Sequence, residues 1–79
     1  MKVSVEVFLK PGVLDVQGKA IEAALAGLGF GGVSDVRVGR IIAFDSAAAD
    51  AATAEAEAKQ MADRLLANAV IERYSVTTG

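Results

Sequence analysis

The polar residues best suited to chemistry or recognition are Asp15, Gln17, Gly18 and Lys19, in the stretch LDVQGKA. Asp15 is a good helix N-cap, because a carboxylate there can accept hydrogen bonds from the free amides of the first turn. Gly18 is unexpected, since glycine inside a helix costs up to about 1 kcal/mol relative to alanine. Glycine also lets another backbone approach closely. The cluster therefore indicates a contact surface, with a capped first turn and a solvated lysine as the plainer alternative.

A second candidate group lies in the middle of the chain, where Arg37 and Arg40 flank Gly39. We expect these residues on an extended segment. There they are either contact residues or charges that blunt an exposed strand edge. We include Gly39 and Arg40 with Asp15, Gln17, Gly18 and Lys19 as candidate partner-contact residues.

Catalysis by this chain alone is disfavoured by its composition, which has no cysteine and no histidine. A cysteine nucleophile and a Ser–His pair are therefore impossible. The stretch GLGFGG, residues 27–32, matches G-x-G-x-x-G, but a helix is expected before it and a strand after it. The dinucleotide fingerprint requires the opposite order. We expect no catalytic residue, no metal and no bound cofactor in this chain.

The 79 residues form one expected domain, 1–79. A domain this small is marginal alone, and without cysteine or histidine it lacks disulfides and structural zinc as reinforcement. With 53% hydrophobic residues, some apolar surface is expected at interfaces of a homo-oligomer. The net charge is -2 and the basic residues are scattered, which argues against nucleic acid. No membrane span or secretion signal is recognisable, so we expect a cytoplasmic protein.

The periodicity predicts three extended segments and two helices. Residues 2–10 alternate, with Val3, Val5 and Val7 on one face. A helix follows from Asp15 to about residue 28 and ends at Gly29. Its apolar stripe, which should face the core, comprises Ala20, Ile21, Ala24, Leu25 and Leu28.

The second half of the chain repeats this order. An extended segment covers about 33–45, with a bulge or a hairpin at Gly39-Arg40. An alanine-rich helix follows, capped by Asp45, Ser46 or Asp50, and residues 70–77 form the last strand. The inward stripe expected on this helix comprises Ala54, Ala58, Met61, Ala62 and Leu65. We predict an α+β two-layer sandwich, β-α-β-α-β or β-α-ββ-α-β, related to ferredoxin-like folds, with both helices on one face of the sheet.

Three blocks of sequence together resemble one family. They are LKPGVLDVQGKAIEAALAGLGF, VSDVRVGRII and ADRLLANAVIERYSV, and they cover nearly all of residues 2–77. They are similar to PurS, the small subunit of bacterial and archaeal phosphoribosylformylglycinamidine (FGAM) synthase. Val16 and Ala69 stand where this family usually has proline, and Arg40 stands where lysine is common.

The resemblance implies a role in purine biosynthesis as an assembly subunit without catalytic residues. In such complexes a glutaminase subunit (PurQ) releases ammonia, and a synthetase subunit (PurL) uses ATP and Mg to consume it. The small subunit, itself a homo-oligomer, holds the two together. The alternative is a small-molecule-sensing dimeric α+β regulatory domain that uses GFGG and LDVQGK as ligand contacts.

Overall fold

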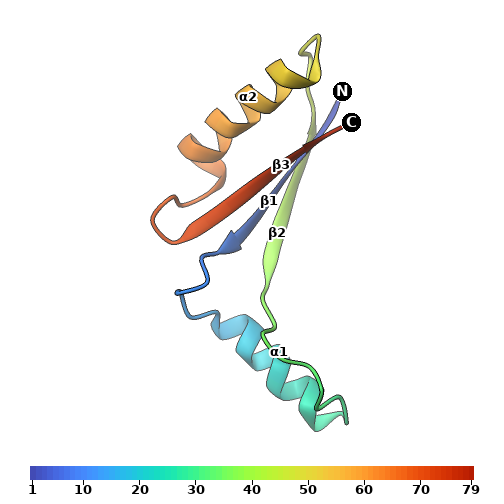
Figure 1. Cartoon of the computed structure of the whole chain (residues 1–79), viewed down its shortest axis with the longest axis vertical. Helices are drawn as coiled ribbons and strands as arrows, with labels where there is room; N and C mark the ends of the chain where they lie inside the picture. The colour runs from blue at the N-terminus through green and yellow to red at the C-terminus, as the bar shows by residue number, and fades with distance from the viewer.

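A computed structural model describes residues 1–79 as an α+β chain with three antiparallel strands (Figure 1). The elements follow the order β-α-β-α-β, which confirms the predicted class. Between α2 and the last strand lies a π-helical turn, η1. The bounds are β1 Lys2–Leu9, α1 Val16–Gly27, β2 Gly39–Asp45, α2 Ala51–Met61, η1 Ala62–Leu66 and β3 Glu72–Thr78.

The sheet has the order β2-β1-β3, so the alternating strand β1 lies at its centre. Val3, Val5 and Val7 on one face of β1 are fully buried, as their spacing predicts. Above them lie the small side chains of Ala54, Ala58 and Ala62, which let the helix approach the sheet closely. These six residues form the buried hydrophobic core.

The middle segment forms a single strand that begins at Gly39, opposite Phe8 of β1. Neither a hairpin nor a bulge interrupts it, so both expectations for Gly39-Arg40 were wrong. Strict alternation holds instead, and Arg40 lies on the same face as Ile42 and Phe44. This is the face covered by α2, because these three residues pair with Val7, Val5 and Val3.

The alanine-rich helix is capped by Asp50, whose carboxylate accepts a hydrogen bond from the Thr53 amide at 2.7 Å. At its end the hydrogen bonding widens to the π pattern, with the Ala67 amide donating to the Ala62 carbonyl. The wider turn changes which leucine faces inward. Leu65 is 83% exposed, whereas Leu66 packs against the core, so the predicted inward position of Leu65 was wrong.

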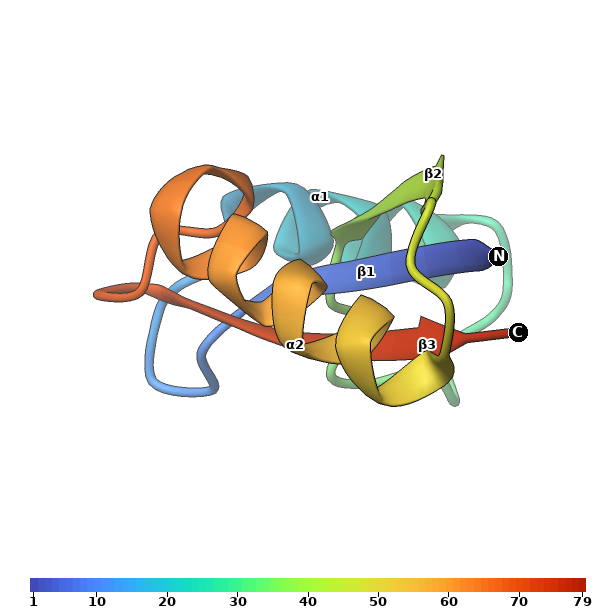
Figure 2. The ribbon, with the colours of Figure 1, turned by 90° about the horizontal axis from the view of Figure 1, so that it is seen from above.

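The two helices are placed differently relative to the sheet. α2 packs against β1 and β3, whereas α1 lies beyond the end of the sheet and makes no substantial contact with any strand (Figures 1 and 2). The predicted placement of both helices on one face therefore holds for α2 only. The chain is elongated, with extents of 49 × 25 × 14 Å. Its radius of gyration of 15.7 Å exceeds the roughly 12 Å of a compact chain this long. No helix is both long and apolar enough to cross a membrane.

The core makes a direct prediction for stability. Val5→Ala removes a fully buried side chain at the centre of the sheet. We expect a loss of about 2 kcal/mol from the free energy of unfolding. Urea unfolding at one fixed protomer concentration measures it. Ser4→Ala, the neighbour on the opposite face, is the matched control and should change little; an equal loss for both variants would contradict the assigned core.

Candidate functional site: the groove between the α1 arm and the sheet

The position of α1 depends on Asp15, a carboxylate that is only 4% exposed. One oxygen accepts the Gly18 amide at 2.8 Å and caps α1. The other accepts the Val38 amide at 2.7 Å, next to the start of β2. These amides, first Val38 and then Gly18, together with the nearby Arg37 charge, lower the pKa of Asp15. One side chain thus joins the start of α1 to the segment that returns to the sheet.

We call residues 14–38 the α1 arm. Two further contacts hold it in place. The Val36 carbonyl packs so closely on Gly18 that an added Cβ would lie 2.2 Å from its oxygen. The Arg37 guanidinium donates to the backbone carbonyls of Lys10 and Val13, both at 3.0 Å. The close backbone approach expected at Gly18 therefore occurs, and the approaching backbone belongs to the same chain.

On the sheet, Arg40 of β2 forms an ion pair with Glu72 of β3. The Arg40 Nη1 atom lies 2.7 Å from the Glu72 Oε2 atom. The guanidinium also donates to the Leu66 carbonyl, and Glu72 accepts the Asn68 amide at 2.7 Å. Arg40, followed by the Asn68 amide, lowers the pKa of Glu72. Beside them Gly39 is required, because a Cβ there would lie 2.5 Å from the Phe8 ring.

Asp15, Gln17, Gly39 and Arg40 come together around one open hollow of about 280 Å³, which we call the groove. Of the other two predicted residues, Gly18 is buried beside Asp15. Lys19 is exposed on α1, and its Nζ atom lies 3.8 Å from the Glu22 Oε2 atom. Glu72 also lines the groove and was not predicted from residue types and spacing. The available signal was its position as an acidic residue on the inward face of a strand. The full lining comprises Val7, Leu9, Asp15, Gln17, Val38, Gly39, Arg40 and Glu72.

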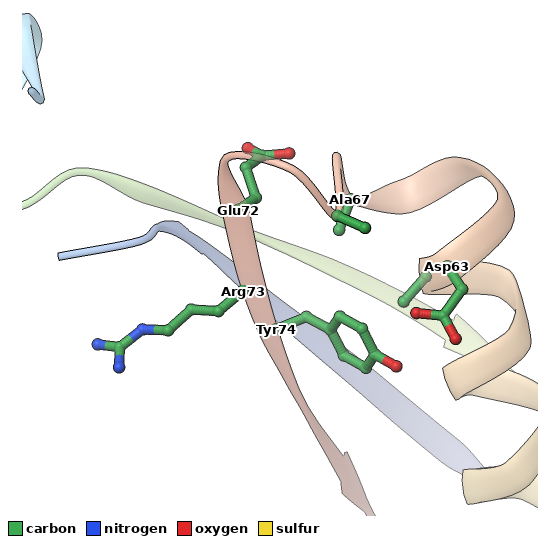
Figure 3. Close-up of a pocket in the computed structure, with 7 residues that line it drawn as sticks. Asp63, Ala67, Glu72, Arg73 and Tyr74 are labelled. Atoms are coloured by element: carbon green, nitrogen blue, oxygen red, sulfur yellow. The ribbon is translucent and has the colours of Figure 1, made fainter. Parts of the chain in front are cut away.

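A second hollow, of about 290 Å³, lies on the other side of Glu72, between η1 and β3. Figure 3 shows the Tyr74 ring and the Asp63 carboxylate turned toward each other, while Arg73 extends from the opposite face of β3. Burial, and then the Asp63 carboxylate, raise the pKa of Tyr74. Three alanines line this hollow together with Tyr74 and the charged residues Asp63, Glu72 and Arg73.

The charged groups of the groove hold the arm and the strands in place, because they are already paired with other groups of the same chain. Both Asp15 oxygens accept amides, and both Glu72 oxygens face Arg40. No buried side-chain polar atom lacks a hydrogen-bond partner. No group of three or more acidic side chains is arranged to hold a metal ion. Gln17 and Lys19 are the polar side chains of the cluster that extend outward from α1.

The family model for PurS, described as phosphoribosylformylglycinamidine (FGAM) synthase, matches residues 2–78. The chain belongs to the PurS family of FGAM synthase subunits. The Synechocystis PurS subunit is 48% identical over 68 residues, which are 86% of this chain and 68% of that protein. The Bacillus subtilis PurS subunit is 41% identical over 73 residues, 92% of this chain and 86% of that protein.

Solved structures agree with the sequence relatives. Methanocaldococcus jannaschii PurS, a subunit of formylglycinamide ribonucleotide amidotransferase, has a TM-score of 0.86 at 34% identity, covering 96% of this chain and 92% of that chain. A chain in the PurLQS structure from Thermotoga maritima has a TM-score of 0.87 at 29% identity, with coverages of 96% and 93%. The resemblance predicted from the three sequence blocks is confirmed.

The close packing at Gly18 provides a test of where the α1 arm lies. We expect Gly18→Ala to lower the free energy of unfolding by about 1–3 kcal/mol, because the new methyl group overlaps the Val36 carbonyl. Thermal unfolding followed by circular dichroism measures the loss. Gly12→Ala is the control, since nothing lies within 4 Å of a Cβ there. Equal stability of the two variants would show that the arm lies elsewhere.

The lowered pKa of Asp15 gives a pH prediction. Because the folded state holds the carboxylate charged, its contribution is present above the unfolded pKa of about 3.9 and is lost as pH falls through the lower folded value. Asp15→Asn should be less stable than the unchanged chain near neutral pH and should lose less additional stability below about pH 4. Urea midpoints across this range compare the slopes. Parallel curves would contradict the prediction.

Proposed function

We propose that this chain is the small assembly subunit of an FGAM synthase and bridges a PurQ glutaminase and a PurL synthetase, so that ammonia passes between them. The observation that carries the proposal is the match to a chain of the PurLQS structure, which covers 96% of this chain and 93% of that chain. In this reading the subunit acts in the cytoplasm, in purine biosynthesis.

The chemistry of the reaction belongs to the partners. Glutamine hydrolysis by a cysteine nucleophile and a histidine base needs two residue types that this chain lacks. ATP and Mg would bind to the synthetase, which uses them to activate its substrate for attack by ammonia. Ammonia that escapes into solution is diluted, and a bridge that keeps two active sites together raises its effective concentration.

The partner contact is assigned to the outward side chains of the arm, Gln17 and Lys19. Asp15, Gly18, Gly39 and Arg40 contribute to the same surface by fixing its shape, because their own groups are used within the chain. Interfaces gain affinity when they are rigid before binding. The double anchoring of the arm by Asp15 and Arg37 supplies that rigidity. The chain works as a homo-oligomer.

Charge reversal at Lys19 tests this assignment. Lys19→Glu should leave the fold intact, because the side chain is 64% exposed, but weaken assembly with PurQ and PurL by roughly tenfold. Glutamine-dependent synthesis titrated against subunit concentration measures assembly. Ammonia-dependent synthesis by the synthetase should not change.

Lys59→Glu is the matched control, since Lys59 is an exposed lysine on α2 that pairs with Glu55. The assignment predicts that the Lys59 variant assembles normally. Equal titration curves for the two lysine variants and the unchanged chain would remove Lys19 from the contact surface.

A further inference from the structure

The eight basic side chains of this acidic chain fall into two groups. Those that form ion pairs with acidic side chains are Lys2, Lys19, Arg40 and Lys59. Those that form none are Lys10, Arg37, Arg64 and Arg73. All of the unpaired cations except Arg64 belong to segments that meet at the turn after β1. Positive charge that no acidic side chain neutralises is therefore concentrated at one place.

A hollow of about 230 Å³ lies at this turn, and two of the unpaired cations line it. We call it the arginine hollow. Its lining comprises Leu9, Pro11, Asp35, Arg37 and Arg73. One guanidinium comes from the α1 arm and the other from β3, so two separate parts of the chain converge on the same space.

The Arg37 guanidinium is already fixed within the chain. Its Nη2 atom donates to the carbonyls of Lys10 and Val13, both at 3.0 Å. Its Nε and Nη1 groups have no hydrogen bond within the chain. A guanidinium presents its donors in a rigid planar fork, which matches the two oxygens of a carboxylate. Because Arg37 is held before binding, it loses little conformational entropy when an anion binds to its free donors.

The Arg73 side chain, in contrast, has no partner within the chain. It extends from β3 away from the Tyr74 ring, on the face of the sheet that α2 does not cover (Figure 3). A neighbouring hollow places it near Glu6, but the two side chains form no ion pair. Arg73 is therefore available to bind an anion brought to the arginine hollow.

The size and charge of the hollow indicate which anion fits. The two guanidiniums and the single carboxylate of Asp35 leave one net positive charge, which matches a carboxylate better than a phosphate group of nearly two negative charges. The volume lies below the range of roughly 300–1,000 Å³ that is usual for small-molecule sites. The apolar side chains of Leu9 and Pro11 suit the methylene groups of an acidic side chain. The hollow therefore fits one acidic side chain of a protein.

We propose that the arginine hollow receives an aspartate or glutamate side chain from one of the two protein partners of the complex. Arg37 and Arg73 bind the carboxylate, and the apolar lining packs on its methylene groups. Charge-assisted pairs between arginine and carboxylate are among the stronger hydrogen-bonded contacts, and arginine is enriched among the residues that dominate interfaces. The inference rests on the proposed function and adds the chemistry of a partner contact separate from the outward residues of α1.

Charge reversal at Arg73 tests the contact. Arg73→Glu should leave the circular dichroism spectrum unchanged and weaken assembly with PurQ and PurL at least tenfold at low salt. The difference from the unchanged chain should shrink as salt rises, because salt screens exposed charges. Arg64→Glu is the matched control, since Arg64 is also exposed and unpaired but lies on η1 and does not line the hollow. It should assemble normally. Titrating PurQ and PurL separately shows which of them carries the acidic side chain.

A chemical test identifies the carboxylate itself. Arg73→Lys places an amine at the hollow, and a carbodiimide joins an amine to a carboxylate in contact with it. In the assembled complex we expect a crosslink from position 73 to an aspartate or glutamate of PurQ or PurL, located by mass spectrometry. Arg64→Lys should give at least tenfold less crosslinked product. A crosslink from position 73 only to a second copy of this chain would overturn the inference.

The remaining outcomes separate this inference from the proposed function. Equal assembly of the unchanged chain and both glutamate variants would overturn the inference and leave the bridging role standing. Saturable binding of inorganic phosphate to this chain, lost in Arg73→Glu, would assign the hollow to a phosphate ligand and also overturn it. Failure of the unchanged chain to assemble with PurQ and PurL would overturn the proposed function and this inference with it.

Discussion

The arrangement of this chain depends on one buried carboxylate. Asp15 accepts amides from the first turn of α1 and from Val38, and it thereby sets the angle between the arm and the sheet. A buried acidic group is stable only when its oxygens are satisfied, and here the chain's own backbone satisfies both. The rest of the site follows from this bridge. Gly18 makes room for the returning backbone, and Arg37 ties the arm to the loop before it.

The consequence is a small protein that does not close around its own core. In most small domains each helix packs on the sheet of its own chain, because there is little other apolar surface to bury. Here a thin core of valine and alanine supports the sheet and one helix, and the second helix is presented outward. Such a shape suits a PurS-type subunit, whose role in a complex is to offer surface to several neighbours at once.

Local signals in the sequence predicted most elements and their caps. Asp15, Asp50 and Gly29 lie where capping predicts, and the alternating valines of β1 are buried. The direction of α1 relative to the sheet was not predictable. An apolar stripe indicates that one side of a helix packs on another surface, but it does not indicate whether that surface belongs to the same chain. The start of β2 at Gly39 was also missed, since the close contact with the Phe8 ring is a tertiary cause. Residue types and the cost of a helical glycine led to the proposed contact cluster, and the structure separates its exposed members, Gln17 and Lys19, from those whose groups are used within the chain.

The shortest extent of the chain, 14 Å, runs across the three strands. Figure 1 looks down this axis and shows α2 beside the sheet, and Figure 2 shows β2, β1 and β3 following one another along it. Neighbouring strands lie about 4.8 Å apart, so the two outer strands of a three-stranded sheet are only about 10 Å apart. Proteins seated on the two strand edges of this chain would therefore be held closer together than a sheet of ordinary width allows.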